Sequence, residues 1–262
     1  MSAAVFPLGS REVTKAKTVK IGTSTTQYRV EGRGDPLVLI HGLGGSTGWW
    51  VRNIGALSQH FTVYTVDLPG FGGMRRHPEP FSVRGAVAWL ETLFDALGLD
   101  TVSLVGHSMG ALVAAIFAGE RPERVHRLVL AAPAIELPSS RIAAYLLPLA
   151  RETLRVERSF WKTLVWDSLR AGLSTAVHAS RDLLRSNVDY ELSQISTPCL
   201  LIWGELDPLV PPNLAGGLQK KIQGSELCVL KGAGHVLMYD HAEPFNTVVL
   251  EFLAGRFEGR HA

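Results

Sequence analysis

Residues 102–113 have the sequence VSLVGHSMGALV, a short apolar strand followed by a glycine-flanked turn and the start of a helix. A G-x-S-x-G pattern in this context places its serine on a sharp strand-to-helix turn, with the hydroxyl raised above the edge of a sheet. The glycines leave space where a side chain would collide with backbone, and a helix start favours a developing negative charge. Taken alone, the pattern also fits an ordinary glycine-rich turn. Its position between a strand and a helix predicts that Ser108 is a nucleophile.

Apolar runs of similar length recur on both sides of this stretch and alternate with helical patterns. Such alternation is typical of a mostly parallel sheet with helices on both faces. Residues 18–21 and 27–30 instead alternate in polarity, as a half-exposed antiparallel hairpin does. We therefore predict an α/β fold with an eight-stranded, mostly parallel sheet, whose other strands lie at residues 36–40, 61–66, 102–105, 128–131, 199–203 and 227–230.

The helical patterns between these runs indicate one domain with an insertion. Apolar residues recur at helical spacing from 83 to 97, ahead of Gly98 as a stop, and again after Ser108 and near the end of the chain. Between residues 136 and 192, helix-like patterns occur without a strand candidate. We interpret 136–192 as a small helical cap inserted into an α/β core, whose two parts are residues 1–135 and 193–262.

A serine hydroxyl becomes a nucleophile when a base within hydrogen-bond reach takes its proton. Among nine histidines, His235 follows the last predicted strand in the flexible loop GAGH, which can turn a side chain back over the sheet. His241, six residues further on, is the main alternative. His107 lies next to Ser108 in the turn, and we expect its side chain to point away from the site. His235 is the predicted general base.

The acid that orients this base is expected between nucleophile and base in the chain. Asp207 fits this order, because the predicted strand at 199–203 runs into Gly-Glu-Leu-Asp-Pro and leaves a carboxylate just past the strand's end. Such an acid holds the imidazole in the correct tautomer and stabilises its charged form. Glu205 is the nearest alternative and fits a solvated loop charge. Residues 132–134, after the preceding strand, contain no acid.

A glycine-rich loop, HGLGG at residues 41–45, follows the strand at 36–40. A strand-to-helix loop at this point can supply one backbone donor to an oxyanion, and the residue after the nucleophile supplies the other. The expected oxyanion hole is therefore made of the N–H groups of Leu43 and Met109. Glycines that serve only the turn are the alternative.

Together these stretches resemble the α/β-hydrolase superfamily over nearly the whole chain apart from the cap. The motifs that carry the resemblance stand in the family's order: HGLGG, DLPGFG at 67–72, GHSMG, WGELDPLVP at 203–211 and GAGH. The chain is most similar to a carboxylesterase-like or lipase-like serine hydrolase with a small helical cap. By this resemblance Asp67 belongs to a structural turn and has no catalytic role. Ser108 departs from the haloalkane dehalogenases and epoxide hydrolases of the family, which have aspartate there.

The composition restricts the partners that the chain can bind. A net charge of +2 comes from 26 basic and 24 acidic residues, with no dense run of Lys or Arg, which argues against a nucleic-acid partner. The N-terminal residues lack the pattern of a secretory signal, and no run of about 18 apolar residues could span a bilayer. We expect a soluble cytoplasmic protein without integral membrane association.

Cofactors and disulfides are not expected either. Cys199 and Cys228 lie in predicted strands, where buried free thiols are the usual state. No metal-binding cluster or phosphate loop stands out, since the glycines after His41 are explained by the oxyanion role. The predicted chemistry therefore depends on side chains and backbone groups alone.

The cap carries the only indication of the substrate. Its apolar residues, with one tryptophan near the glycine-rich loop, are candidates for an apolar pocket: Trp49, Tyr145, Leu146, Trp161 and Trp166. Apolar cap residues that only attach the cap to its core are the alternative. We predict a carboxylic ester hydrolase acting on short or medium acyl esters, or monoacylglycerols, through an acyl-serine. Three alternatives stay open: a carbon–carbon bond hydrolase of ring-cleavage products, a cofactor-free haloperoxidase or perhydrolase, and a receptor-like homologue with negligible turnover.

Overall fold

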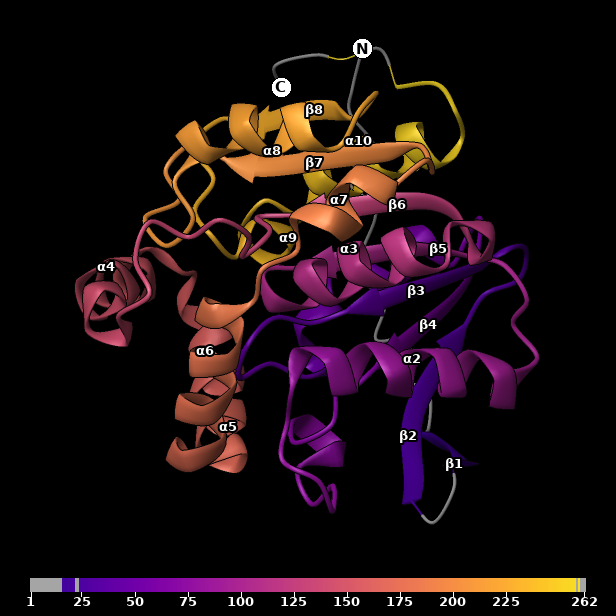
Figure 1. Ribbon diagram of the computed structural model, residues 1–262, viewed down its shortest axis with the longest axis horizontal. Helices are drawn as coiled ribbons and strands as arrows, with labels where there is room; N and C mark the ends of the chain where they lie inside the picture. Colours follow the sequence, from indigo (N-terminus) through magenta and orange to yellow (C-terminus); the bar gives the residue numbers. More distant parts are fainter. Residues whose placement is uncertain (1–15, 22–23, 258, 260–262) are drawn as a thin grey trace, which may run out of the picture.

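An eight-stranded sheet runs through the centre of the molecule (Figure 1). The computed structural model describes residues 16–21, 24–257 and 259. The strand order is β1-β2-β4-β3-β5-β6-β7-β8. The strands are β1 (Lys17–Ile21), β2 (Ser24–Glu31), β3 (Pro36–Ile40), β4 (Thr62–Val66), β5 (Val102–His107), β6 (Val125–Ala131), β7 (Cys199–Gly204) and β8 (Glu226–Leu230).

The predicted α/β fold with a mostly parallel sheet is confirmed. β1 and β2 form the antiparallel hairpin, β2 is also antiparallel to β4, and every other neighbouring pair is parallel. The main differences are at strand ends. β6 begins three residues before the apolar run, because Val125 and Arg127 still pair with β5 although His126 and Arg127 are not fully buried.

Alternate residues of the central strands pack on opposite sides of the sheet. In β3, Leu37 and Leu39 belong to one apolar cluster while Val38 and Ile40 belong to the other, and all four are fully buried. Side chains of a strand point alternately to its two faces, so a sheet covered on both faces needs apolar residues at every position. This explains the unbroken apolar runs in the sequence.

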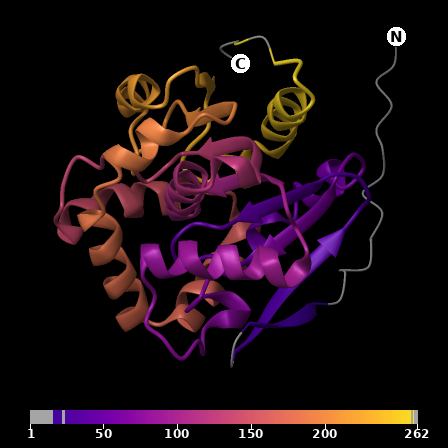
Figure 2. The ribbon, with the colours of Figure 1, turned by 45° about the vertical axis from the view of Figure 1, so that its right-hand side comes forward.

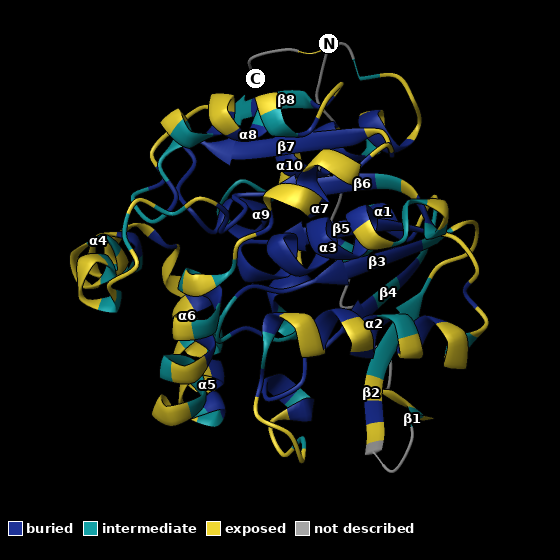
Figure 3. Cartoon of the chain, viewed as in Figure 1, coloured by how far each residue is buried: buried dark blue, intermediate teal, exposed yellow. Residues whose placement is uncertain are grey.

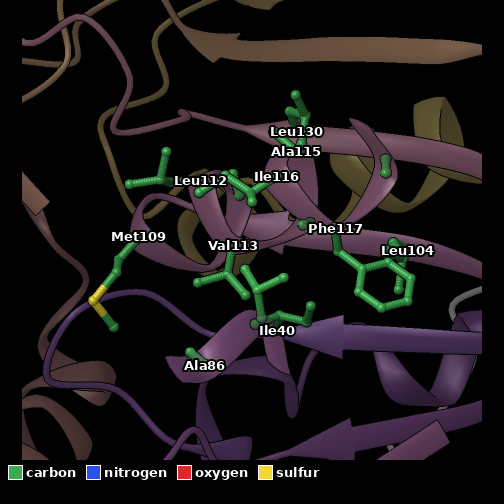
Figure 4. Close-up of a cluster of buried hydrophobic side chains, with 14 of the residues drawn as sticks. Ile40, Ala86, Leu104, Met109, Leu112, Val113, Ala115, Ile116, Phe117 and Leu130 are labelled. Atoms are coloured by element: carbon green, nitrogen blue, oxygen red, sulfur yellow. The ribbon is translucent and has the colours of Figure 1, made fainter. Parts of the chain in front are cut away.

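Helices cover both faces of the sheet. Side chains of α2, α3 and α8 join one cluster, and those of α1, α9 and α10 join the other. Figure 4 shows Val113 of α3 beside Ile40 of β3 and Ala86 of α2. Helix α3 is buried almost all round (Figure 3). These helices are α1 (Ile54–Leu57), α2 (Val83–Leu97), α3 (Met109–Glu120), α8 (Ala215–Lys221), α9 (Leu237–Asp240) and α10 (Ala242–Leu253).

Short 3-10 helices and well-defined caps join these elements. Helix α2 ends at Gly98, whose φ of 65° is the left-handed conformation predicted for a stop. Neither Cys199 nor Cys228 is in a disulfide, and both are buried, as predicted. The 3-10 helices of the core are η1 (Thr47–Trp50), η2 (Gly72–Met74), η3 (Pro122–Arg124) and η5 (Pro212–Leu214).

All regular secondary structure in the segment between β6 and β7 is helical. We call residues 136–192 the cap. Its helices α4 to α6 lie together at the left of Figure 1, the side to which the β7 arrow points, and stay together at the left in the turned view of Figure 2. Helix α7 instead packs against α3, where a Cβ added at Gly119 would lie 2.2 Å from the Glu191 carbonyl oxygen. The elements are η4 (Ile142–Tyr145), α4 (Leu146–Arg155), α5 (Arg158–Ala171), α6 (Leu173–Arg185) and α7 (Asp189–Gln194).

Within the described part of the chain, no helix combines the length and apolar character needed to cross a bilayer.

Candidate active site

Ser108 occupies the turn between β5 and α3 with a backbone that most residues avoid. Its φ is 52° and its ψ is −114°, and such conformations store strain that is common at functional sites. The flanking glycines are needed for space. A Cβ at Gly106 would lie 2.4 Å from the Gly110 carbonyl oxygen, and one at Gly110 would lie 2.5 Å from the carbonyl oxygens of Ile40 and His41. The turn can therefore form only with glycine at both positions.

His235 and Asp207 lie beside Ser108 although they come from loops far along the chain. The His235 Nε2 atom is 3.0 Å from Ser108 Oγ, and His235 Nδ1 is 2.7 Å from Asp207 Oδ2. All three residues are at least nine-tenths buried. The structure thus brings the three predicted side chains together, with His235 rather than His241 next to the serine.

The Asp207 carboxylate is held by its own loop. Its Oδ1 accepts the backbone N–H groups of Leu209 and Val210 at 2.8 and 2.9 Å. This leaves Oδ2 to accept the His235 Nδ1–H, so that Nε2 is the acceptor for the Ser108 hydroxyl. Burial opposes the charged form of His235, but the charge and hydrogen bond of Asp207, together with Glu152, raise its pKa above the usual value.

His107 packs against this arrangement instead of pointing away from it, which corrects our expectation. Its ring centroid is 4.8 Å from that of His235 and 5.8 Å from that of Trp49. Its Nε2–H donates to the His235 carbonyl oxygen at 2.9 Å. Burial, and then the nearby His235, hold the pKa of His107 well below its ordinary value. A neutral His107 therefore fixes the backbone of the histidine loop.

The glycine-rich loop lies against the serine turn, since a Cβ added at Gly42 would be 3.2 Å from Ser108 Cβ. Leu43 lines the cavity described below, and Met109 is the first residue of α3, so its N–H has no acceptor within the helix. His41 has a structural role, because its Nδ1–H donates to the Gly42 carbonyl oxygen and its Nε2 accepts the Leu68 N–H. Asp67 also has a structural role. Among the described residues, its carboxylate accepts hydrogen bonds from the backbone N–H groups of Thr47 and Gly73.

A cavity of about 540 Å³ lies over Ser108 and His235, between the cap and the core. This volume is in the range of about 300–1,000 Å³ that is common for small-molecule sites. Trp49, Tyr145 and Leu146 line it as expected. Tyr145 is held there by hydrogen bonds with the backbone of Ser139.

Trp161 and Trp166 do not line the cavity, contrary to our expectation. The α5 residues that face it are Leu164, Ser168, Leu169 and Ala171. Trp166 is two residues from Leu164 and is therefore rotated by about 200° around the helix, where it is 59% exposed beside Arg170. Trp161 is 40% exposed and donates its Nε1–H to the Val156 carbonyl oxygen at the junction of α4 and α5.

Two buried carboxylates of the cap contact the loops of the site, and sequence reasoning missed both. Glu152 Oε1 accepts the backbone N–H groups of His235 and Val236 at 2.7 and 3.0 Å. Asp167 Oδ2 accepts the Ser46 hydroxyl at 2.7 Å and the Trp49 Nε1–H at 3.1 Å. Burial raises the pKa of both carboxyl groups. The cap therefore holds the histidine loop and the loop after β3 at the same time.

A sequence signal for these carboxylates does exist. Glu152 is three residues after Leu149 and four before Val156, so it shares a helix face with two residues that line the cavity. Asp167 has the same relation to Leu164 and Ala171. An acidic residue on the apolar stripe of a helix is unusual, because a buried charge is costly without partners.

Comparisons with known proteins agree with this fold. A family described as "alpha/beta hydrolase fold" matches residues 35–186, and one described as "TAP-like protein" matches residues 179–257. The chain is 30% identical to a 2-hydroxy-6-oxononadienedioate/2-hydroxy-6-oxononatrienedioate hydrolase of Burkholderia vietnamiensis, over 92% of this chain and 96% of that protein.

Solved structures are similar over comparable lengths. A bromoperoxidase from Bacillus anthracis has a TM-score of 0.79 at 23% identity, covering 92% of this chain and all of that one. A carboxylesterase from Bacillus subtilis has a TM-score of 0.73 at 25% identity, covering 93% of each chain. With the family match over more than half of its length, the chain belongs to the α/β-hydrolase family and is a hydrolase.

Proposed function

We propose that this hydrolase cleaves uncharged carboxylic esters with short or medium acyl chains, through an acyl-enzyme on Ser108. The observation that carries the proposal is the connected set of hydrogen bonds from Asp207 through His235 to Ser108 at the floor of an apolar cavity. A serine next to a histidine that is itself oriented by a carboxylate is the arrangement for nucleophilic acyl transfer.

In the first step Ser108 Oγ bonds to the ester carbonyl carbon while His235 Nε2 takes the hydroxyl proton. The carbonyl oxygen becomes an oxyanion, for which the N–H groups of Leu43 and Met109 are the proposed donors. The tetrahedral intermediate then collapses, the bond to the alcohol oxygen breaks, and His235 gives its proton to that oxygen. Asp207 stabilises the charged imidazole and stays ionised.

In the second step water attacks the acyl-serine while His235 takes a proton from the water. The bond from Ser108 Oγ to the acyl carbon breaks, and the proton returns to Ser108. The products are a carboxylic acid and the alcohol, and the side chains return to their starting state. Every proton moves through His235, which agrees with its contact to Ser108 on one side and Asp207 on the other.

The lining of the cavity favours an uncharged substrate. Apart from His107 and His235 it contains no basic side chain; all residues of this lining lie in the described part of the chain, and neither Arg nor Lys is among them. A buried carboxylate needs a partner to offset its desolvation. An ester with an apolar acyl chain has no charge to desolvate on entering the cavity. A dianionic substrate would have to desolvate two carboxylates there.

A second candidate function comes from the relatives. The Burkholderia vietnamiensis hydrolase is named for a dienedioate substrate, which fits the carbon–carbon bond hydrolase that the sequence left open. The same three side chains could serve that reaction. The alignment with this relative covers 92% of this chain at 30% sequence identity. The absence of Arg and Lys from the described lining of the cavity argues for the ester.

A graded substrate panel tests the proposal. p-Nitrophenyl esters of two to twelve acyl carbons, a vinylogous 2-hydroxy-6-oxodienedioate, and acetate with peroxide are assayed on wild type and on the Ser108→Ala variant. We expect ester hydrolysis in wild type and a loss of about 10⁴-fold or more in the variant. Faster turnover of the dienedioate than of every ester would overturn the ester assignment, and negligible turnover of all substrates would favour a receptor-like role.

A further inference from the structure

Glu152 lines the cavity, and only one of its two carboxylate oxygens accepts hydrogen bonds from the described part of the protein. It lies on α4 of the cap and is 3% exposed. Its Oε1 accepts the backbone N–H groups of His235 and Val236. These bonds fix the carboxylate against the histidine loop.

The other oxygen, Glu152 Oε2, is buried and has no hydrogen-bond partner among the described residues. A buried polar atom without a partner costs free energy, so each one in a native protein requires an explanation. Glu152 is also the only acidic side chain among the described residues that line the cavity. A partner that arrives with the substrate would account for this oxygen.

The position of Glu152 indicates which part of the substrate it would meet. In the proposed reaction His235 Nε2 gives its proton to the leaving oxygen, so the alcohol part of the ester lies against the histidine loop. Glu152 contacts that same loop at His235 and Val236. The groups proposed for the oxyanion, in contrast, come from Leu43 and Met109.

We propose that Glu152 Oε2 accepts a hydrogen bond from a hydroxyl group on the alcohol part of the substrate. The preferred substrates are then esters whose alcohol carries a second hydroxyl, such as monoesters of a diol or of glycerol. This inference rests on the proposed ester hydrolysis and adds the class of alcohol. A site that hydrogen-bonds a substrate hydroxyl discriminates strongly against the analogue without it, because its own polar group is then left unpaired.

Two pairs of esters of equal size test the inference on the wild-type protein. 2-Hydroxyethyl butyrate is compared with propyl butyrate, and 2-methoxyethyl butyrate with butyl butyrate. The first pair differs by a hydrogen-bond donor, whereas the second differs only by an acceptor. We expect kcat/KM to favour the hydroxyethyl ester over propyl by about tenfold or more and to show no such preference for methoxyethyl. Assays at pH 8 favour the ionised form of Glu152, whose pKa is raised by burial.

Glu152→Gln then assigns the preference to this side chain. The amide keeps an oxygen for the two backbone N–H groups but replaces Oε2 with a donor. We expect the hydroxyethyl-to-propyl ratio to fall by about tenfold, and the methoxyethyl-to-butyl ratio to stay or rise. Ser180→Ala is the matched control, because it removes another hydroxyl that lines the cavity and already bonds the Ala176 carbonyl oxygen. Its hydroxyethyl-to-propyl ratio should equal that of wild type.

The outcomes separate this inference from the proposed function. If wild type hydrolyses all four esters without preferring hydroxyethyl, the hydroxyl subsite is wrong and the ester assignment stands. The same holds if the preference survives in Glu152→Gln. If wild type hydrolyses none of them and none of the p-nitrophenyl esters, both proposals are overturned. Because the wild-type ratios need no variant, a poorly folding Glu152→Gln protein does not remove the test.

Discussion

At the scale of single residues, Ser108 combines a reactive position with an unfavourable backbone. Its φ of 52° places a side chain where glycine is favoured, and such strain costs about 1–3 kcal/mol. The glycines beside it, together with the hydrogen bond from its N–H to the Ala131 carbonyl oxygen, hold the conformation. The backbone conformation that presents the Ser108 hydroxyl to His235 therefore lowers the stability of the fold.

This strain predicts that Ser108→Gly unfolds at higher urea than Ser108→Ala. Both variants lack the hydroxyl and its bond to His235, so the comparison isolates the backbone. Glycine relieves the backbone strain but loses more conformational entropy on folding than alanine does. The net difference in the free energy of unfolding is about 1 kcal/mol in favour of Ser108→Gly. Equal or lower stability of Ser108→Gly in urea titrations would show that Ser108 is not strained.

The contacts of His235 lead to a prediction for the dependence of activity on pH. The base must be neutral, and Asp207, with Glu152, raises the pKa of His235 despite burial. Activity should therefore fall on the acid side with a midpoint above about 6.5, the usual value for histidine. Asp207→Asn removes the main stabiliser of the charged form, so the midpoint should move down.

Measurement of kcat/KM from pH 5 to 9 tests this directly. In Asp207→Asn we also expect the rate at pH 8 to fall by about 10³–10⁴-fold, because the imidazole loses its orienting partner. A midpoint that does not move would mean that the acid limb belongs to another group.

At the scale of elements, the sequence was most informative where all residues of an element have the same surroundings, as in a strand that is buried on both faces. The buried strands and the stop at Gly98 were predicted closely, because a two-sided sheet permits only apolar runs and the left-handed stop favours glycine. The faces of the cap helices were not predicted. Trp166 and Glu152 illustrate this, since the tryptophan is exposed to solvent whereas the carboxylate is buried among residues that line the cavity. On a helix with apolar residues all round, only packing selects the inner face.

Helix α5 provides a test of how the cap supports the site. Asp167 Oδ2 accepts the Ser46 hydroxyl and the Trp49 Nε1–H, and Asp167→Leu leaves the half-buried hydroxyl and the buried indole N–H without this acceptor. We expect a loss of about 1–3 kcal/mol in stability and a lower kcat/KM, since Trp49 lines the cavity. Asp167→Asn keeps a carbonyl oxygen as acceptor, so its losses in stability and in kcat/KM should be smaller.

The exposed ion pair of Arg52 and Glu157, which also joins core and cap, is the control for this test. Exposed pairs contribute little, so Glu157→Gln should change stability less than Asp167→Leu does. Urea unfolding and steady-state kinetics on the same preparations measure both effects. A larger loss from Glu157→Gln would contradict the role assigned to Asp167.

At the scale of the whole molecule, the cavity exists only because the cap lies over the ends of the strands. Core residues such as Ser108 and His235 form its floor, while cap residues from α4, α5 and α6 form its roof. The chemistry and the choice of substrate thus come from different parts of the chain. Changes at roof residues that do not bond the loops of the floor should alter the choice of ester with little effect on the floor.

Ala176→Phe tests this division, because Ala176 of α6 lines the cavity. A phenyl group reduces the space for a long acyl chain, and each methylene excluded from an apolar pocket costs about 1–3 kcal/mol. We expect kcat/KM for an octanoyl ester to fall at least tenfold relative to an acetyl ester. A parallel fall for both esters in the chain-length panel would mean that Ala176 does not face the acyl chain.

The sequence by itself determined the α/β fold, the order of its strands and helices, and the three residues that we propose as the triad. These depend on local rules: burial on both faces of a sheet, glycine at close approaches, and polar residues just past strand ends. Tertiary structure alone decided that His107 packs against His235, that Trp161 and Trp166 lie outside the cavity, and that Glu152 enters it. The reason is physical, because the inner face of a cap helix is defined by what it packs against, and that surface comes from distant parts of the chain.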